Sequence, residues 1–122
     1  MLDLSEAAAE MNRLSELLDK GLEALRNFAV QAAQAEREYR HGKAAAWVET
    51  PHEHAGRKLT AVEREAMVNS ATADDRYARD LAVGMERAAL EAVRSRRAQI
   101  SHHQSMLSAE KAEAEFARVG PR

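Results

Sequence analysis

The sequence contains no cysteine, only two prolines and five glycines, and few aromatic side chains, which make up 4% of its 122 residues. Without cysteine the chain has no disulfide bond, no thiolate metal site and no cysteine nucleophile. Apolar residues reach 45%, but many of them are alanine, so we expect a thin seam between helices rather than a thick globular core. The shortage of proline and glycine predicts long helices with few turns, in one domain over residues 1–122.

Segments for secretion or membrane insertion are also absent from the sequence. The first fourteen residues place Asp3, Glu6 and Glu10 before the first base, Arg13, which is not the pattern of a signal peptide. No apolar run approaches the ~20 residues that a transmembrane helix needs. We therefore expect a soluble, cytoplasmic protein that does not bind membranes.

Charge is distributed unevenly along the chain. The net charge is −2 with histidine neutral, yet residues 1–23 carry −4 and residues 87–103 carry +3. An acidic beginning and a basic patch near the other end are therefore concealed by a nearly neutral total.

Apolar residues of the first half repeat every seven positions, which predicts a coiled-coil-like helix over residues 3–47. One set of positions is Leu4, Met11, Leu18, Leu25, Ala32, Tyr39 and Ala46, and the other is Ala7, Leu14, Gly21, Phe28, Ala35 and Gly42. The later positions are small, which permits close helix approach but buries less apolar surface.

A loop is predicted over residues 49–59, because Pro51 and Gly56 interrupt the helical pattern. Thr60 and Glu63 then form a capping-box pattern at the start of a second helix over residues 61–118, with a break possible near Gly84 or Ser101 and a stop signal at Gly120-Pro121. Two apolar stripes follow 3–4 spacing on this helix. The first contains Met67, Ala71, Ala78, Leu81, Met85, Ala88 and Ala92, and the adjacent one contains Val93, Ile100 and Leu107.

These elements predict an all-α fold, a long antiparallel helical hairpin. Two alanine-rich helices bury little apolar surface at roughly 25 cal/mol per Å², against ~1–2 kcal/mol of entropy lost per ordered residue. We therefore predict that the hairpin assembles into a homo-oligomer.

Sites for catalysis, cofactors and metals are poorly supported. The sequence has no glycine-rich phosphate loop, no nucleophile elbow and no carboxylate cluster, so we expect a protein that is not an enzyme and needs no cofactor. His52 and His54 lie in the loop without a third ligand, and the adjacent His102 and His103 point ~100° apart on a helix. We expect no metal site, and treat the last two histidines as an extension of the basic patch.

The basic residues form the candidate binding site. Three arginines gather in "VRSRRAQ", a second cluster lies on the first helix, and two further bases lie in the loop; the candidates are Arg94, Arg96, Arg97, Arg37, Arg40, Lys43, Arg57 and Lys58. Tyr39 and Trp47 could stack on nucleic-acid bases or belong to the seam. The alternative is that Arg94–Arg97 pair with Glu10 and Glu16 on the first helix of the hairpin, in surface pairs worth only ~0–1 kcal/mol each.

The stretch "AALEAVRSRRAQISHHQSML" resembles the C-terminal segment of UvsY-type phage recombination mediators. The similarity is close over residues 88–106 and extends to the order of elements over residues 30–113. The corresponding residues are Ala89, Leu90, Glu91, Ala92, Val93, Arg94, Ser95, Arg96, Ile100, His103, Gln104 and Met106. On the first helix the match is looser, because Gln34, Ala35 and Glu36 stand where the family has bases.

The resemblance implies a small helical bacteriophage protein of the host cytoplasm that forms homo-oligomers and binds single-stranded DNA. Such a protein would help to load a RecA-like recombinase where single-strand-binding protein blocks access. The sequence leaves a second interpretation open, a coiled-coil scaffold or assembly chaperone that binds no DNA. A more distant one is an inhibitor whose acidic first helix mimics DNA.

Overall fold

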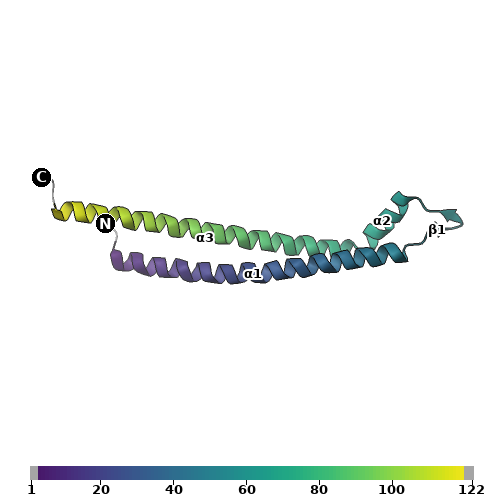
Figure 1. The fold of residues 1–122 in the computed structure, drawn as a ribbon, viewed down its shortest axis with the longest axis horizontal. Helices are drawn as coiled ribbons and strands as arrows, with labels where there is room; N and C mark the ends of the chain where they lie inside the picture. Colours follow the sequence, from purple (N-terminus) through teal and green to yellow (C-terminus); the bar gives the residue numbers. More distant parts are fainter. Residues whose placement is uncertain (1–2, 120–122) are drawn as a thin grey trace. The chain divides into compact units, whose positions relative to one another are not determined.

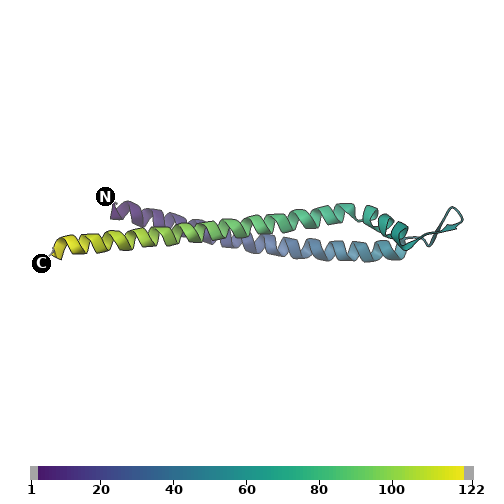
Figure 2. The ribbon, with the colours of Figure 1, turned by 90° about the horizontal axis from the view of Figure 1, so that it is seen from above.

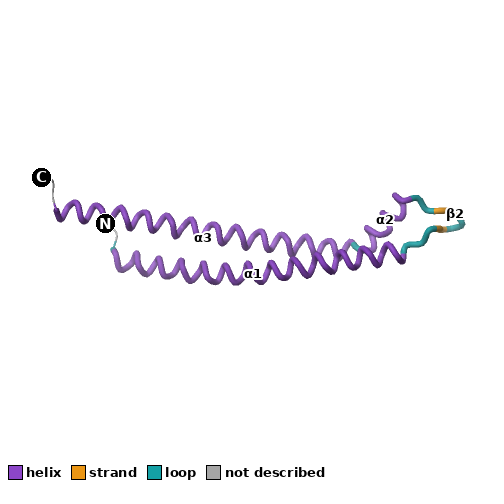
Figure 3. The backbone as a smooth tube through the Cα atoms, in the orientation of Figure 1, coloured by secondary structure: helices purple, strands orange, loops and turns teal. Residues whose placement is uncertain are grey.

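The structure, a computed structural model, describes residues 3–119 and shows an all-α helical hairpin in which α1 packs against α3. Helix α1 spans Leu4–Glu49, α2 spans Ala61–Ala71 and α3 spans Ala73–Val119 (Figure 1). Two short strands, β1 (Glu53–His54) and β2 (Arg57–Lys58), connect α1 to α2 (Figure 3). None of the described helices is long and apolar enough to cross a membrane. The expected stop at Gly120-Pro121 lies outside the described residues.

Local interactions at both ends of α1 explain where this helix begins and ends. The Asp3 carboxylate accepts a hydrogen bond from the Ser5 amide at 2.8 Å, which satisfies one of the free N–H groups of the first turn. At the other end, Thr50 donates its amide to the Ala46 carbonyl at 2.9 Å, and Pro51 prevents another helical turn. The helix therefore ends close to residue 47, where the sequence predicted its end.

The predicted loop contains a small antiparallel β-hairpin, which the sequence analysis did not anticipate. Glu53 pairs with Lys58 and His54 with Arg57. Ala55 (φ 54°) and Gly56 (φ 75°) form the two-residue turn between them. Positive φ at both central positions is typical of a type I′ turn, which matches the twist of the flanking strands.

The second helix is interrupted at Thr72, whereas α3 continues through Gly84 and Ser101, where the sequence left a break possible. The Thr72 side chain is buried and donates a hydrogen bond to the Val68 carbonyl at 2.8 Å, which competes with the regular helical pattern. Asp74 and Asp75 occupy the first turn of α3, where acidic side chains interact favourably with the helix dipole. The pattern Thr72-x-x-Asp75 is a helix-start signal that could have located the break.

The described residues form two compact units. Unit 1 combines the first part of α1, up to Leu25, with α3 from Ala88 onward, and unit 2 contains residues 26–87. In both units α1 and α3 lie side by side, as the two views show (Figures 1 and 2).

The seam of unit 1 is aliphatic. Leu14 and Val93 are almost completely buried, and Ala7 and Ala89 are buried beside them. Gly21 permits close approach, because a Cβ at this position would lie 3.4 Å from Val93 Cγ2. The predicted heptad positions of the first helix therefore do form its packed side, except for Leu4, which is exposed.

The seam of unit 2 combines aliphatic, small, aromatic and polar residues. Its buried residues are Ala32, Tyr39, Ala46, Leu59, Val68 and Thr72. Gly42 faces Asp75 so closely that an added Cβ would lie 2.6 Å from Asp75 Oδ2. Small residues in α1 thus allow a polar side chain of α3 to pack directly against the helix backbone.

On α3, the packed stripe is the one with Val93, Ile100 and Leu107, whose residues are buried or half-buried. The residues of the other predicted stripe are all exposed: Met67, Ala71, Ala78, Leu81, Met85, Ala88 and Ala92. Both stripes have helical spacing, so periodicity alone could not choose between them. The larger aliphatic side chains of the adjacent stripe bury more apolar surface opposite α1.

Candidate functional site

The C-terminal arginine cluster lies on α3 within unit 1. Arg94 and Arg97, three residues apart, are exposed on neighbouring positions of the helix surface. Arg94 Nη1 donates a hydrogen bond to Glu91 Oε1 at 2.9 Å, and both side chains of this pair are highly exposed. Such a pair is easily opened by competing anions, because exposed ion pairs contribute ~0–1 kcal/mol at most.

Arg96 occupies a different position from its two neighbours. It is half-buried and donates a hydrogen bond from Nη1 to Gln99 Oε1 at 3.0 Å on the same helix. Because successive residues on a helix are rotated by ~100°, Arg96 lies well around the helix from Arg94. The structure therefore brings together Arg94 and Arg97, and separates Arg96 from them.

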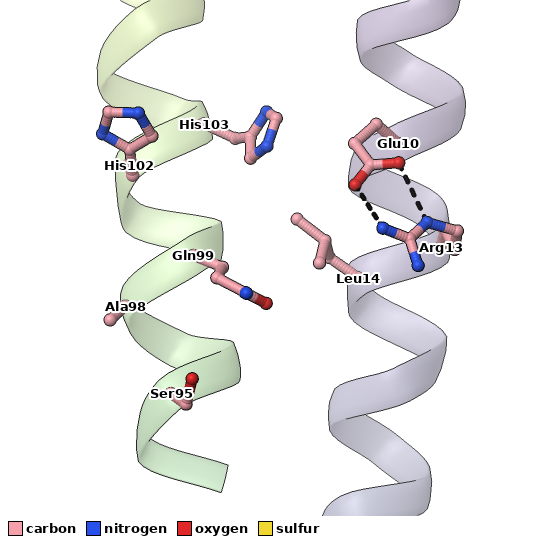
Figure 4. Close-up of a pocket in the computed structure, with 8 residues that line it drawn as sticks. All are labelled: Glu10, Arg13, Leu14, Ser95, Ala98, Gln99, His102 and His103. Carbon is pink, nitrogen blue, oxygen red and sulfur yellow. Dashed lines mark hydrogen bonds and ion pairs between the residues drawn. The ribbon is translucent and has the colours of Figure 1, made fainter. Parts of the chain in front are cut away.

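The expected pairing between these arginines and α1 is not observed. Within residues 3–119, no ion pair connects Arg94, Arg96 or Arg97 with α1. Glu10, one of the two acidic residues expected opposite them, instead accepts two hydrogen bonds from Arg13 on its own helix, one of them from Nε at 2.9 Å (Figure 4). The Arg13 guanidinium lowers the pKa of the Glu10 carboxyl through these hydrogen bonds.

A groove of about 370 Å³ lies between α1 and α3 in unit 1, beside the arginine cluster. It is lined by Glu10, Arg13, Leu14, Ser95, Ala98, Gln99, His102 and His103. Figure 4 shows Gln99 and His103 directed from α3 toward α1, and Leu14 directed from α1 toward α3. The rings of His102 and His103 are 6.2 Å apart and nearly perpendicular. His103 is half-buried between the helices, whereas His102 is exposed.

Two of the three candidate bases of α1 have partners within the chain. Arg40 Nε donates a hydrogen bond to Glu36 Oε1 at 2.8 Å. Lys43 is half-buried, with Nζ 5.8 Å from the centroid of the Tyr39 ring. Of the three candidates on this helix, only Arg40 forms an ion pair within the described residues. The first-helix cluster therefore offers fewer free cations than its sequence suggests.

Tyr39 belongs to the seam, so its ring is unavailable to nucleic-acid bases. It is buried, and the guanidinium of Arg79 lies over it at 4.4 Å from the centroid. Arg79 Nε is 3.7 Å from Glu36 Oε2, and Arg79 Nη2 is 2.9 Å from Asp80 Oδ1. Arg79 thus links α3 to α1 through a cation–π contact and an ion pair. This role of Arg79 was not predicted, although Arg79 lies fourteen residues, or two heptads, before Val93 in the packed stripe of α3.

Arg57 in β2 is engaged with the start of α2. Its two Nη atoms donate hydrogen bonds to the Glu63 carboxylate at 2.9 and 2.6 Å. Glu63 Oε1 also accepts a hydrogen bond from the Thr60 amide, and Glu63 donates its own amide to Thr60 Oγ1, which completes the predicted capping box. The Arg57 hydrogen bonds, followed by those of Thr60, lower the pKa of Glu63 to about 2. Lys58 is exposed.

Trp47 is covered in a similar way. The Arg64 guanidinium lies 5.5 Å from the centroid of the indole ring, and Arg64 Nε is buried without a hydrogen-bond partner. Trp47 is half-buried beneath it. Like Tyr39, this ring packs against an arginine of the same unit instead of presenting a free face for base stacking.

The candidates include two pairs of exposed guanidinium groups three residues apart, Arg94 with Arg97 on α3 and Arg37 with Arg40 on α1. The α3 pair has a third arginine, Arg96, farther around the same helix. Guanidinium groups of this kind bind phosphate oxygens through charge-assisted hydrogen bonds. Within residues 3–119, no three histidine, aspartate or glutamate side chains gather as potential metal ligands. No family model matches the chain, and no curated protein or solved structure shows significant similarity to it.

Proposed function

We propose that the protein is a recombination mediator that binds single-stranded DNA non-specifically as a homo-oligomer, and helps to load a RecA-like recombinase in place of single-strand-binding protein. One observation supports this proposal above all others. Arg94, Arg96 and Arg97 do not pair with the acidic part of α1, so their charge is available to a polyanion. The resemblance of residues 88–106 to UvsY-type mediators is centred on the same arginines.

Phosphate neutralisation is the physical basis of the proposed binding. Each guanidinium that contacts a phosphate releases a condensed counterion, so affinity grows with the number of contacts and falls steeply with salt. Two or three arginines in one chain would bind a single strand weakly. Several copies that hold the same strand multiply the contacts and raise the effective concentration of each further site. Assembly and DNA binding are therefore coupled parts of one proposal.

The candidate residues differ in how much they should contribute. Arg94 and Arg97 should dominate, because a third arginine, Arg96, lies in the same stretch and the resemblance to UvsY-type mediators is centred there. Arg40 has an exposed partner on its own helix, as Arg94 has, and Arg57 must first leave Glu63, whose carboxylate would otherwise repel a phosphate nearby. Arg37 and Lys58 are exposed and should contribute through charge alone.

Fluorescence anisotropy with a labelled oligo-dT tests the proposal. The wild-type protein should bind at about 50 mM salt and lose affinity as salt increases. Changing Arg94→Glu together with Arg97→Glu should weaken binding by at least about tenfold and reduce the salt dependence. The matched control changes Arg40→Glu with Arg57→Glu, which alters the net charge equally but should reduce affinity much less. No binding by the wild type, or equal losses in both variants, would contradict the assignment.

The mediator activity itself needs a second assay. A RecA-like recombinase should hydrolyse ATP faster on DNA coated with single-strand-binding protein when the chain is added. The Arg94→Glu, Arg97→Glu variant should give no such stimulation. DNA binding without stimulation would restrict the function to single-strand binding.

A coiled-coil scaffold that binds no DNA remains the competing proposal. It is favoured by unit 2, where Arg40, Arg57 and Arg79 are all paired with carboxylates within the chain. The same anisotropy titration separates the two functions, because a scaffold would show no affinity at any salt concentration.

A further inference from the structure

Helix α3 has a second apolar face in unit 2 that has no partner within the described residues. Tyr77, Leu81 and Met85 are spaced four residues apart and remain 70, 53 and 44% exposed. A spacing of four residues produces a continuous ridge along one side of a helix. We call these three residues the α3 ridge.

The α3 ridge is distinct from the side of the helix that packs on α1. Arg79, Ala82 and Glu86 are half-buried in the same turns, whereas the three ridge residues are exposed. At ~100° per residue, the centre of the ridge lies roughly 120° around the helix from these half-buried residues. The helix therefore has two faces suited to helix packing, of which the hairpin uses one.

Small residues flank the ridge and leave space for another helix. Above Gly84 there is nothing within 4 Å of where a Cβ would lie, and Ala78 is exposed on the opposite flank. A ridge of larger side chains next to small ones is the shape that ridges-into-grooves packing requires. The pattern Ala78, Leu81, Met85 continues along the sequence to Ala88 and Ala92, with the 3–4 spacing of a coiled-coil seam. The occupant that fits this face is therefore an amphipathic helix.

The solvent-accessible surface of the chain is larger than that expected of a folded monomer of the same mass. A folded monomer of 13.5 kDa normally exposes about 6,500 Å². This chain exposes 9332 Å², roughly 2,800 Å² more than that expectation. Obligate interfaces bury a total of roughly 2,000–5,000 Å², or roughly 1,000–2,500 Å² from each of two partners, so the surplus is large enough to supply this chain's share of a permanent interface.

We infer that the α3 ridge is the surface through which two copies of this chain join, with their α3 helices antiparallel about a two-fold axis close to Leu81. In that arrangement the two Leu81 side chains meet at the axis, and Tyr77 of each copy lies against Met85 of the other. The pairing joins a thioether to an aromatic ring, a favourable contact. An interface in which the same patch serves both partners is typical of two-fold homodimers.

This inference deepens the proposed function, because it names the surface that would bring several arginine clusters together. Sedimentation velocity tests it without DNA. Wild-type protein at micromolar concentration should sediment as an assembly, and changing Leu81→Glu with Met85→Glu should lower the mass toward the 13.5 kDa of one chain. The control is Val48→Glu, an 86% exposed apolar residue of the same unit, which should leave the mass unchanged. Circular dichroism should show equal helicity in all three proteins.

A cross-linking experiment keeps the test decisive if the double variant does not fold. The chain has no cysteine, so a Leu81→Cys chain carries a single thiol. Disulfide formation requires two Cβ atoms roughly 3.5–4.5 Å apart, which only residues near the axis satisfy. Leu81→Cys should form a disulfide-linked dimer much faster than Val48→Cys under mild oxidation. Equal rates, or wild-type protein that sediments as one folded chain, would overturn the inference.

The two sets of experiments test the docking surface and the DNA binding independently. A protein that assembles through the α3 ridge but does not bind oligo-dT contradicts the proposed function and supports the docking surface. A protein that binds oligo-dT as a single chain contradicts the docking surface and supports the DNA contact at Arg94 and Arg97.

Discussion

Units 1 and 2 use arginine in opposite ways. In unit 2, three guanidinium groups connect different elements, although Arg40 pairs within α1: Arg79 reaches Tyr39 and Glu36, Arg64 covers Trp47, and Arg57 binds Glu63. In unit 1, the described arginines interact only with residues of their own helix, such as Glu91 and Gln99 for the C-terminal cluster. The same residue type thus maintains the structure in one unit and remains available for binding in the other.

The difference follows from the residues that form the seam of each unit. Unit 1 packs aliphatic side chains, with Leu14 and Val93 almost fully buried, and needs no charged group to join its helices. In unit 2, Gly42 of α1 leaves room for Asp75 of α3 to approach the helix backbone, and Arg79 of α3 lies over the Tyr39 ring. Within the described residues, the seam of unit 1 therefore forms without ion pairs between α1 and Arg94, Arg96 or Arg97.

The largest effect should follow from removing the aliphatic seam of unit 1. Leu14→Ala is expected to lower the free energy of unfolding by about 3 kcal/mol, because the lost burial and the cavity both destabilise the fold. Leu4→Ala, at an exposed position of the same helix, should cost less than about 0.5 kcal/mol. Urea denaturation followed by circular dichroism measures both. Similar losses would show that Leu14 does not belong to a specific seam.

An intermediate effect should follow from removing the aromatic ring that Arg79 covers in unit 2. Tyr39→Leu keeps an apolar side chain but removes the ring face, and should cost about 1 kcal/mol more than Tyr39→Phe, which retains it. The same denaturation experiment compares the two variants. If leucine and phenylalanine are equivalent, the cation–π contact does not stabilise unit 2, and the contrast between the units is reduced to apolar burial.

The smallest effect concerns the ion pair between Arg57 and Glu63. In the folded chain the pKa of Glu63 is lowered to about 2, so the folded state binds the proton less readily than the unfolded state does. The stabilisation from this carboxylate is complete above the ordinary pKa of 4.5 and is lost as pH falls from there toward about 2.

Thermal melts of the wild type and of Glu63→Gln measure this loss. The wild type should melt at a higher temperature near pH 6, and the difference should shrink progressively between pH 4.5 and 2. A constant difference over this range would indicate that the capping hydrogen bonds, not the charge, stabilise the start of α2.

Most of the fold could be predicted from the sequence, because its signals are local. Heptad spacing identified the packed side of α1, and Thr60 with Glu63 located the start of α2. The choice between the two stripes of α3 depended on packing against α1, which periodicity does not describe. The turn at Ala55-Gly56 was missed because alanine rarely adopts a positive φ.

The candidate site was harder to predict, because it also depends on contacts between residues that are distant in the sequence. Composition identified every basic cluster, but whether an arginine is free depends on which carboxylate or ring lies near it in space. Arg57 and Arg40 have such partners, whereas Arg97 has none within the described residues. From the sequence, Tyr39 could either stack on nucleic-acid bases or belong to the seam. Its burial and its contact with Arg79 place it in the seam.

The composition of unit 1 from two distant stretches has a consequence for the order of folding. Residues 3–25 must meet residues 88–119 across more than sixty intervening positions, and the entropy of closing such a loop is lost before any contact is gained. Unit 2 is continuous and has a tight turn at its centre, so its contacts are nearer in sequence and should form faster. Once unit 2 is folded, it shortens the effective loop for unit 1. The arginines would then be presented only by chains that have already completed the rest of the hairpin.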